Sequence, residues 1–390
     1  MQNPNFKILK KDTKTKARLG ILSTPHGKVK TPSYVIVATY GHIRHLKPAD
    51  IKKTKTQLLI CNTYHLWDKA LEPNAKNIVP SLLGTKIPAM TDSGGFQVFS
   101  LAFGQDNKVS KILGKENILN KPTRKNIKIA EKGVYFKLNG ANKFLGPELS
   151  VRIQEKLGAD IIFAFDECTS PLDDYEYNIK ALKRTHKWAK LCLATKTRKD
   201  QMLFGIVQGG LDKELRVQSA KFTASLPFDG FGIGGSFNKE QISKVLKWII
   251  PYLPDQKPRH LLGIGKIEDI FMAVENGVDT FDCVIPTREA RHGRIWTSSG
   301  KIDIRRGAFK NDGSKIEKGC KCPTCSKSIS RSRLNNLFKS PAEKDRALAQ
   351  RYALLHNIWF FNNLLEKIRG AIEKRKFGEF KQKFLSRFQP

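Results

Sequence analysis

The sequence predicts an α/β fold, a (β/α)8 TIM barrel, and three observations point to it. Eight short segments are apolar throughout rather than alternating, which is typical of parallel strands buried on both faces. Most of these segments are followed by an amphipathic stretch of helical character. Together the units occupy about 280 residues, a length that suits eight such units. An open, doubly wound parallel sheet would give the same pattern and stays the structural alternative.

The expected elements follow one another in the order that a barrel requires. Strands are expected at residues 34–37, 57–60, 87–90, 160–165, 203–207, 230–233, 260–264 and 279–284. Helices between the later strands are expected at 177–194, 212–225, 240–250 and 266–276. Residues 101–140 interrupt this alternation with nine basic and three acidic residues, and we expect an irregular basic segment there.

The charge balance indicates a polyanionic partner. The 390 residues include 70 Lys and Arg against 36 Asp and Glu, a net charge of +34. Nucleic acid is the simplest partner for such an excess, and a solvated basic surface or a membrane-facing patch is the alternative. No segment approaches the ~18 consecutive apolar residues of a membrane span, and residues 1–5 lack the apolar core of a secretory signal. We therefore expect a cytoplasmic protein without a membrane partner.

Polar residues collect where the expected strands end. Asp92, Asp166, Gln208, Gly235 and Asp282 each lie at the end of a different strand. In a (β/α)8 barrel these ends meet at one rim, where catalytic groups lie. A single carboxylate at such a place is more often a helix cap, but successive strand ends of the same character predict one catalytic pocket.

Three of the seven cysteines cluster at Cys320, Cys322 and Cys325, and His356 follows 31 residues after the last of them. These are the ligand types of tetrahedral zinc, and four protein ligands leave no open position. The pattern therefore predicts one structural Zn²⁺ per chain. A reduced cysteine cluster with an unrelated histidine is the alternative.

At this point the motifs carry a resemblance. The motifs that carry it are Asp92-Ser93-Gly94-Gly95-Phe96-Gln97, Phe165-Asp166-Glu167-Cys168, Val207-Gln208-Gly209-Gly210, Phe281–Arg288 and the Cys3His set. From about Phe6 to its end, the chain resembles the tRNA-guanine transglycosylases, or queuine tRNA-ribosyltransferases, in their bacterial form, and these motifs occur in the same order as in that family. The resemblance implies a barrel with a zinc-binding subdomain inserted near the last strand and a helical C-terminus, and usually a homodimer. It also implies a pentosyltransferase that exchanges guanine 34 in tRNAs with GUN anticodons for a 7-deazaguanine, in queuosine biosynthesis.

The resemblance also assigns a domain division and roles. One domain would span 1–390, with the barrel and an N-terminal extension at 1–305, the zinc-binding subdomain at 306–357 and the helical segment at 358–390. Asp282 would be the nucleophile that captures C1′, and Asp92 the general acid/base. The replaced base would be bound by Asp92, Ser93, Gly94, Gly95, Phe96, Asp166, Gln208, Gly235 and Leu262, with Phe96 and Leu262 on its two faces unless they are only core residues.

RNA contacts are implied for two segments that follow the seventh and eighth strands. They comprise Gly263, Ile264, Gly265, Lys266, Ile267, Glu268, Asp269, Thr287, Arg288, Glu289, Ala290 and Arg291. Guanidinium groups suit phosphates and base edges because they donate in pairs, and the basic C-terminal region, with 22 basic and 8 acidic residues in 301–390, would add nonspecific attraction.

The chain departs from the family pattern in three places. Residues 103–130 exceed the usual loop, and the interval between Cys325 and His356 is longer than typical. Residues 234–240 differ from the usual bacterial motif, and this difference bears on which base the protein accepts. Glu240 keeps the acidic end of that motif and favours 7-aminomethyl-7-deazaguanine (preQ1), whereas Ser236 and Asn238 would leave room for queuine. Two other functions remain open: a non-catalytic tRNA-binding partner subunit, and a barrel lyase or hydrolase for a small anionic metabolite.

Overall fold

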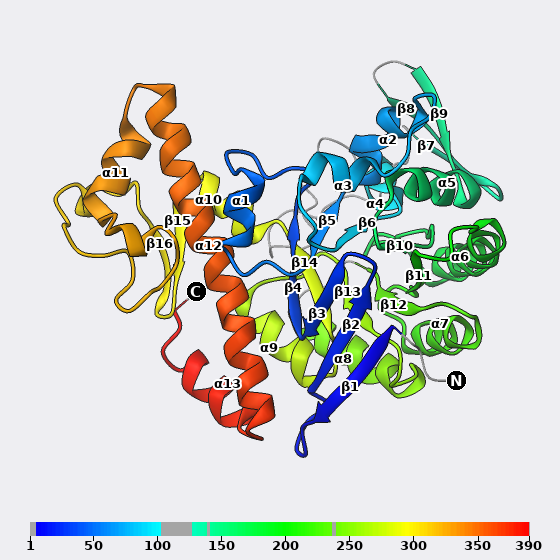
Figure 1. Cartoon of the computed structure of the whole chain (residues 1–390). Coiled ribbons are helices and arrows are strands. Elements are labelled where there is room, and N and C mark those ends of the chain that lie inside the picture. The colour runs from blue at the N-terminus through cyan, green and yellow to red at the C-terminus, as the bar shows by residue number, and fades with distance from the viewer. Residues whose placement is uncertain (1–4, 103–126, 139–140, 236–238, 390) are drawn as a thin grey trace.

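The computed structural model describes residues 5–102, 127–138, 141–235 and 239–389 (Figure 1). Eight parallel strands close into a barrel, which confirms the (β/α)8 fold and excludes the open sheet. In barrel order, the strands are β4 (Ser33–Val37), β5 (Leu59–Cys61), β6 (Ala89–Thr91), β10 (Ile161–Phe163), β11 (Met202–Val207), β12 (Gly230–Ile233), β13 (Arg259–Leu261) and β14 (Thr280–Cys283). Pairing of β14 with β4 closes the ring.

Two strands end earlier than the sequence predicts. β10 ends at Phe163 instead of residue 165, and β13 ends at Leu261 instead of residue 264. The first N–H group beyond each of these points, on Ala164 and Leu262, still donates to a carbonyl of the neighbouring strand. The next bond to side chains: Phe165 N donates to Cys192 Sγ at 3.3 Å and Gly263 N to Asp282 Oδ1 at 2.9 Å. The apolar runs therefore continue past the sheet because the chain is still buried after it leaves the ladder.

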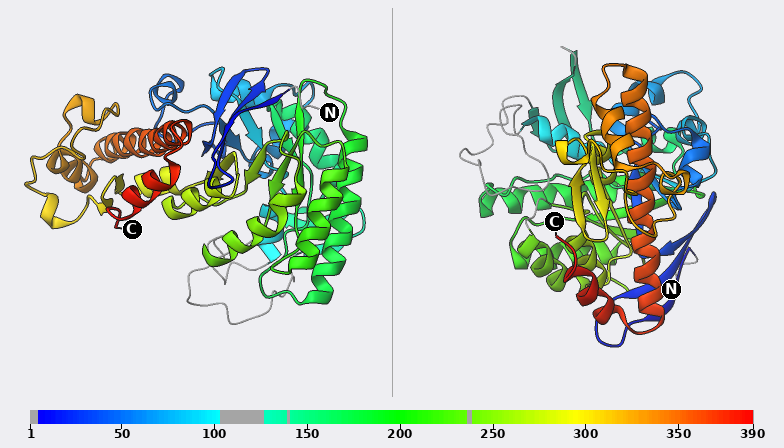
Figure 2. Two further views of the ribbon diagram at one scale, coloured as in Figure 1. Left: turned by 90° about the horizontal axis from the view of Figure 1, so that it is seen from below. Right: turned by 90° about the vertical axis from the view of Figure 1, so that its left-hand side faces the viewer.

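Helices cover the outside of the barrel (Figures 1 and 2). They are α1 (Pro48–Lys52), α2 (Thr63–Leu71), α3 (Ile78–Leu83), α4 (Gly95–Ala102), α5 (Pro147–Leu157), α6 (Tyr175–Thr195), α7 (Lys213–Ser225), α8 (Lys239–Ile249) and α9 (Ile267–Glu275), with a 3-10 turn η1 (Ile250–Tyr252) after α8. The four predicted helices correspond to α6–α9 and their ends differ by at most two residues. Asp174 and Asp212 begin α6 and α7 as N-caps, accepting from Tyr177 N and Leu215 N.

The N-terminal extension closes one end of the barrel. It forms an antiparallel sheet of β1 (Phe6–Lys11), β2 (Arg18–Thr24) and β3 (Gly27–Thr31). Phe6, Leu22 and Val29 of this sheet pack in one cluster with the side chains that fill the barrel, such as Met90 and Phe204. The filled interior therefore leaves the opposite end, at the strand C-termini, as the place where a ligand can enter.

The prediction of an irregular segment at 101–140 is wrong for residues 127–138. These residues and 141–145 form an antiparallel sheet of β7 (Ile127–Ala130), β8 (Gly133–Leu138) and β9 (Ala141–Leu145). The central strand β8 alternates buried and exposed residues, with Val134 and Phe136 facing inward and Tyr135 and Lys137 outward, and this period of two was overlooked beside the high charge. The expected long basic loop at about 103–130 falls mostly outside the described residues.

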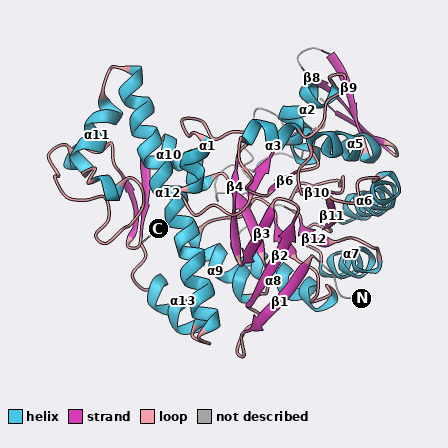
Figure 3. Cartoon of the chain, in the orientation of Figure 1, coloured by secondary structure: helices cyan, strands magenta, loops and turns pink. Residues whose placement is uncertain are grey.

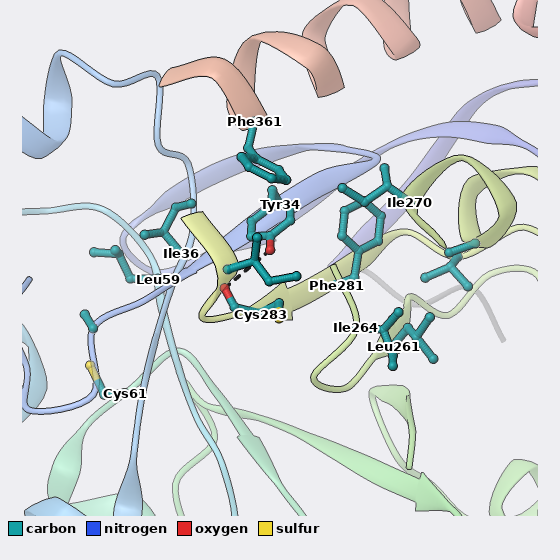
Figure 4. Packing of buried hydrophobic residues seen from close by; sticks show 14 of the residues in the cluster. Tyr34, Ile36, Leu59, Cys61, Leu261, Ile264, Ile270, Phe281, Cys283 and Phe361 are labelled. Carbon is teal, nitrogen blue, oxygen red and sulfur yellow. Dashed lines mark hydrogen bonds between the residues drawn. The ribbon is translucent and has the colours of Figure 1, made fainter. Parts of the chain in front are cut away.

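The C-terminal region packs on the barrel at β4 and, through its long helix, on β1 and β2 of the N-terminal sheet. It contains α10 (Ile285–Arg291), β15 (Arg294–Thr297), β16 (Gly300–Asp303), the short turns η2 (Gly307–Phe309) and η3 (Cys325–Lys327), and α11 (Arg331–Lys339), α12 (Glu343–Glu373) and α13 (Phe377–Leu385). α12 continues through the boundary expected at residues 357 and 358, as Figure 3 shows. Its Phe361 packs on Tyr34 of β4, with ring centroids 5.1 Å apart (Figure 4). Among the described helices, none has the length and apolar character needed to cross a bilayer.

Candidate active site

The C-terminal ends of the barrel strands surround a cavity of about 380 Å³. The predicted residues that line it are Asp92, Ser93, Phe96, Asp166, Gln208, Gly235, Leu262, Gly263, Asp282 and Arg288. Gly94 and Gly95 support the wall from behind. Gly94 N donates to Asp92 Oδ1, and a Cβ on Gly95 would lie 3.1 Å from the carbonyl oxygen of Asp166. Barrel closure thus brings together groups from six strand ends.

Asp92 is held by four N–H donors. Its Oδ1 accepts from the backbone of Thr63 (3.0 Å) and Gly94 (3.1 Å), and its Oδ2 accepts from Asn62 Nδ2 (2.7 Å) and Gln97 Nε2 (3.2 Å). Gly94 has φ of +77°, a backbone conformation that residues with a side chain rarely adopt. The carboxylate is therefore fixed in orientation at the pocket wall, which suits a group that exchanges protons with a ligand.

Asp282 is held by a main-chain donor and a buried histidine. Its Oδ1 accepts from Gly263 N at 2.9 Å and from His260 Nε2 at 3.2 Å, and its side chain is 16% exposed. His260 is fully buried, and its Nδ1 lies 2.9 Å from Thr280 Oγ1. Because a carboxylate can only accept, Nε2 carries the hydrogen, and the imidazole orients Asp282 toward the cavity.

Asp166 and Gln208 form a carboxylate–amide pair on the neighbouring wall. Gln208 Nε2 donates to Asp166 Oδ2 at 2.6 Å, and both residues are buried. The backbone N of Gln208 donates in turn to Ser219 Oγ on α7 at 3.1 Å. The pair offers acceptor and donor groups side by side, which is the pattern needed to bind the edge of a planar heterocycle.

A buried arginine stabilises this wall from outside the cavity. Arg216 of α7 is fully buried and donates to the carbonyls of Val207 (3.0 Å), Gly210 (2.8 Å) and Gly234 (2.8 Å). Burial lowers the pKa of Arg216 to about 9, so the guanidinium is still protonated at neutral pH. It therefore ties together the ends of β11 and β12, which carry Gln208 and Gly235.

The thiol of Cys61, which also lines the cavity, is not suited to nucleophilic attack. Burial raises the pKa of Cys61 to about 12, so its thiolate is scarce near pH 7. Burial also lowers the pKa of His65, another lining residue, which favours its neutral form. The acidic and guanidinium side chains that line the cavity are those of Asp92, Asp166, Asp282 and Arg288.

Several residues of the site were missed by the sequence reasoning. Asn62, Thr63 and His65 directly follow β5, so the rule that polar residues mark strand ends would have found them. Gln97 ends the motif that begins at Asp92, but no function was predicted for it. His260 and Arg216 lie within a strand and a helix, where nothing local distinguishes them from core residues.

The segments predicted to contact RNA are only partly accessible. Lys266 and Arg288 are exposed, and Arg291 is half-buried. Side-chain contact with RNA does not fit the buried members of the set, because their side chains pack inside the protein: Ile264, Ile267, Asp269, Thr287 and Ala290. Gly265 is also enclosed, since a Cβ there would lie 2.3 Å from Tyr34 Oη, and Glu289 pairs with Arg294 at 3.4 Å.

A basic cluster borders the cavity. Burial lowers the pKa of Arg291, and the neighbouring charges of Arg44 and Arg288 lower it further. Arg44 is exposed on the loop after β4 and was not predicted. Three guanidinium groups from two separate segments therefore face the same region, which favours an anion.

Cys320, Cys322, Cys325 and His356 form a group that could hold a metal ion, since their ligand atoms all lie within 4.8 Å of one another. The three Sγ atoms are 3.9, 3.3 and 3.5 Å from His356 Nδ1. A tetrahedron with metal–sulfur bonds of about 2.3 Å and a metal–nitrogen bond of about 2.0 Å has S···N edges of about 3.5 Å. His356 Nε2 lies 2.8 Å from the carbonyl of Trp296, to which it donates, so Nδ1 is left to bind the metal.

The fold and the site define a (β/α)8 enzyme that presents separately held carboxylates and a carboxylate–amide pair to one cavity. Residues 12–390 match the family model described as queuine tRNA-ribosyltransferase. The queuine tRNA-ribosyltransferase of Halothermothrix orenii is 38% identical, with 98% of each chain covered. A putative queuine tRNA-ribosyltransferase of Archaeoglobus fulgidus is 41% identical, covering 96% of this chain and 98% of the relative. The chain belongs to this family and is a tRNA-guanine transglycosylase, a pentosyltransferase.

Proposed function

We propose that the protein replaces guanine at wobble position 34 of tRNAs with GUN anticodons by a 7-deazaguanine, through a covalent ribosyl-enzyme on Asp282. The observation that carries this proposal is the position of the Asp282 carboxylate, which faces the cavity between Gly263 N and the buried His260. A carboxylate is the group that captures an oxocarbenium-like sugar in retaining glycosyl transfer.

The reaction consists of two displacements. In the first, an oxygen of Asp282 bonds to C1′ as the C1′–N9 bond breaks, and the electron pair of that bond leaves with guanine. Asp92 assists this departure by proton transfer. In the second, Asp92 takes the N9 proton of the incoming base, whose nitrogen then attacks C1′ and releases Asp282. The four donors around Asp92 support this role because they hold its carboxylate in one orientation.

The replaced base would be recognised by Asp166 and Gln208. A carboxylate accepts from N1–H and the exocyclic amine of guanine, and an amide N–H donates to O6. Phe96 of α4 and Leu262 after β13 line the same cavity from different elements, and both are partly exposed, as expected of groups that contact the two faces of an extruded base. Their partial exposure favours this role over that of core residues.

The incoming base is proposed to be preQ1, with queuine as the alternative. Ser236 and Asn238, on which the alternative depends, lie outside the described residues, and Glu240 is exposed in the first turn of α8. The test is competition between the two bases for guanine-34 tRNA, read as kcat/KM. A clear preference for queuine would overturn this choice of base and leave the catalytic assignment intact.

The exchange itself is tested by incubating the protein with unmodified tRNA and radiolabelled guanine. Incorporation of label into tRNA is expected, with Asp282→Asn as the inactive control. Absence of incorporation by protein that binds tRNA would favour the non-catalytic partner subunit. Asp92, Asp282 and all four members of the Cys3His group are present, which argues against that alternative.

Zinc, homodimer formation and a cytoplasmic location complete the proposal. Cys320, Cys322, Cys325 and His356 would hold one structural Zn²⁺, because thiolate and imidazole in tetrahedral spacing suit this ion and leave no ligand position open. The homodimer rests on the family resemblance and is tested by sedimentation of the purified chain.

A further inference from the structure

The outer face of the β7–β9 sheet carries an aromatic pair between lysines. Tyr135 of β8 lies opposite Lys128 of β7 and opposite Phe144 of β9, so the three form one row across the sheet. Tyr135 is 49% exposed, and its ring centroid is 4.8 Å from that of Phe144. Lys137 follows two residues later on the same exposed face. We define Lys128, Tyr135, Lys137 and Phe144 as the sheet platform.

The sheet platform lies near the cavity entrance. The inner face of the same sheet packs on α2, where Phe136 contacts Tyr64 and Trp67 at ring-centroid distances of 6.2 and 6.1 Å. His65, which follows Tyr64 in α2, lines the cavity. Leu145 at the end of β9 lies against the turn that follows β6, where a Cβ on Gly94 would be 3.3 Å from its side chain, so the sheet lies at the end of the barrel where the strand C-termini open.

In the part of the chain that the structure describes, the lysines of the sheet platform have no acidic partner. Lys143 pairs with Asp68 at 2.9 Å, and the acidic residue of the sheet, Glu131, pairs with Lys187 at 3.0 Å. Within the described ranges, no carboxylate lies in ion-pair distance of Lys128, Lys132 or Lys137. An exposed aromatic ring with unpaired cations beside it favours a ligand that has both a planar apolar surface and negative charge.

We propose that the sheet platform binds tRNA, with an unpaired base stacked on Tyr135 and neighbouring phosphates at Lys128 and Lys137. This inference rests on the proposed function, which makes a tRNA the substrate. An antiparallel sheet with exposed aromatics is a surface on which unstacked bases pack, and the phosphates that flank such a base need cations at its sides. The contact would hold the substrate outside the cavity and take no part in base exchange.

The test compares Tyr135→Ala with Tyr252→Ala in the full-length protein. Tyr252 in η1 is 41% exposed and has Lys221 Nζ 4.9 Å from its ring centroid, but it precedes β13 at the opposite end of the barrel. Loss of one base-stacking contact corresponds to about a 5- to 100-fold weaker Kd for tRNA. We expect that loss for Tyr135→Ala alone, recovery in Tyr135→Phe, and an unchanged KM for free guanine.

Two outcomes would overturn the inference: tRNA affinity of Tyr135→Ala equal to that of the unaltered protein, or equal losses from Tyr135→Ala and Tyr252→Ala. Filter binding of tRNA is measured separately from guanine incorporation. If Tyr135→Ala weakens tRNA binding but the unaltered protein incorporates no guanine, the proposed exchange is refuted and the inference about the sheet platform still holds.

Discussion

His260 Nε2 lies 3.2 Å from Asp282 Oδ1, and the two residues are on adjacent strands, β13 and β14. The histidine is inaccessible to solvent, whereas the aspartate faces the cavity. Because His260 is buried behind Asp282, the proposed nucleophile, we expect it to act on the reaction through the position of that carboxylate. The contribution of His260 to the reaction can therefore be measured separately from that of Asp282.

Replacement of His260 by alanine should slow formation of the ribosyl-enzyme about 10- to 100-fold, since a hydrogen bond to a charged group contributes roughly 1.5–3 kcal/mol. His260→Gln should restore part of the rate, because its amide can donate to Asp282. The rate is measured as appearance of a denaturation-resistant protein–tRNA adduct. His186→Ala is the control, since His186 stacks on Phe222 outside the cavity. Equal rates for His260→Ala and the unaltered protein would show that the contact is dispensable.

Removal of Asp282, the proposed nucleophile, should have a larger effect than removal of His260. Asp282→Ala should abolish both exchange and the adduct while tRNA binding survives, because the basic surface is unchanged. Asp92→Ala should form some adduct but fail to turn over, since the incoming base then lacks its proton acceptor. Gel electrophoresis under denaturing conditions separates the two defects. Normal turnover by Asp282→Ala would refute the mechanism.

Replacement of Arg216 should weaken binding of the base more than binding of the tRNA. Arg216→Gln removes donors to the carbonyls of Gly210, Val207 and Gly234, so Gln208 and Gly235 lose their fixed positions. We expect KM for guanine to rise about tenfold or more, while Kd for tRNA stays the same. Arg259→Gln is the matched control, because Arg259 is also buried and donates to the carbonyls of Leu253 and Gly277 at the other end of the barrel. Similar changes in KM for both variants would mean that only stability was affected.

Loss of a metal ligand should remove metal and stability together. Elemental analysis should find one zinc per chain, and Cys322→Ser should lower both the zinc content and the Tm, because binding to a folded site contributes directly to folding. Cys192→Ser should keep its zinc, since Cys192 is buried elsewhere, between Phe165 N and the Pro147 carbonyl. Full stability and activity of metal-free protein would contradict a structural zinc.

The basic cluster at the cavity should contribute more to anticodon recognition than basic residues elsewhere. Arg288→Ala or Arg291→Ala should lower kcat/KM for tRNA more than Lys374→Ala, which removes an exposed charge at the end of α12. Overall binding should weaken with salt, with a slope of about −0.7 per neutralised phosphate of single-stranded RNA. Equal losses from the two regions would indicate nonspecific attraction only.

The sequence by itself predicted eight strand–helix units, because continuously apolar runs with helical crossovers are a local pattern that each segment carries independently. It left the choice between a closed barrel and an open sheet to the tertiary structure. It also determined that Asp92, Asp166, Gln208 and Asp282 share a rim, since in a barrel every strand end points to the same side. The Cys3His group was predicted from ligand types, and the structure brings its four members together. Strand β8 could also have been predicted, from the alternation of inward Val134 and Phe136 with outward Tyr135 and Lys137, but the high charge of the region drew attention away from it.

Only the tertiary structure decided which residues support these groups. Asn62 reaches Asp92 from the neighbouring strand end, His260 reaches Asp282 across the β13–β14 register, and Arg216 crosses from a helix to two strand ends. These three contacts join residues that are 30, 22 and 18 positions apart, and they depend on strand register and barrel closure. Periodicity reports only whether a side chain faces inward. The physical reason is that burial is a property of one position, whereas a hydrogen bond depends on the relative placement of two.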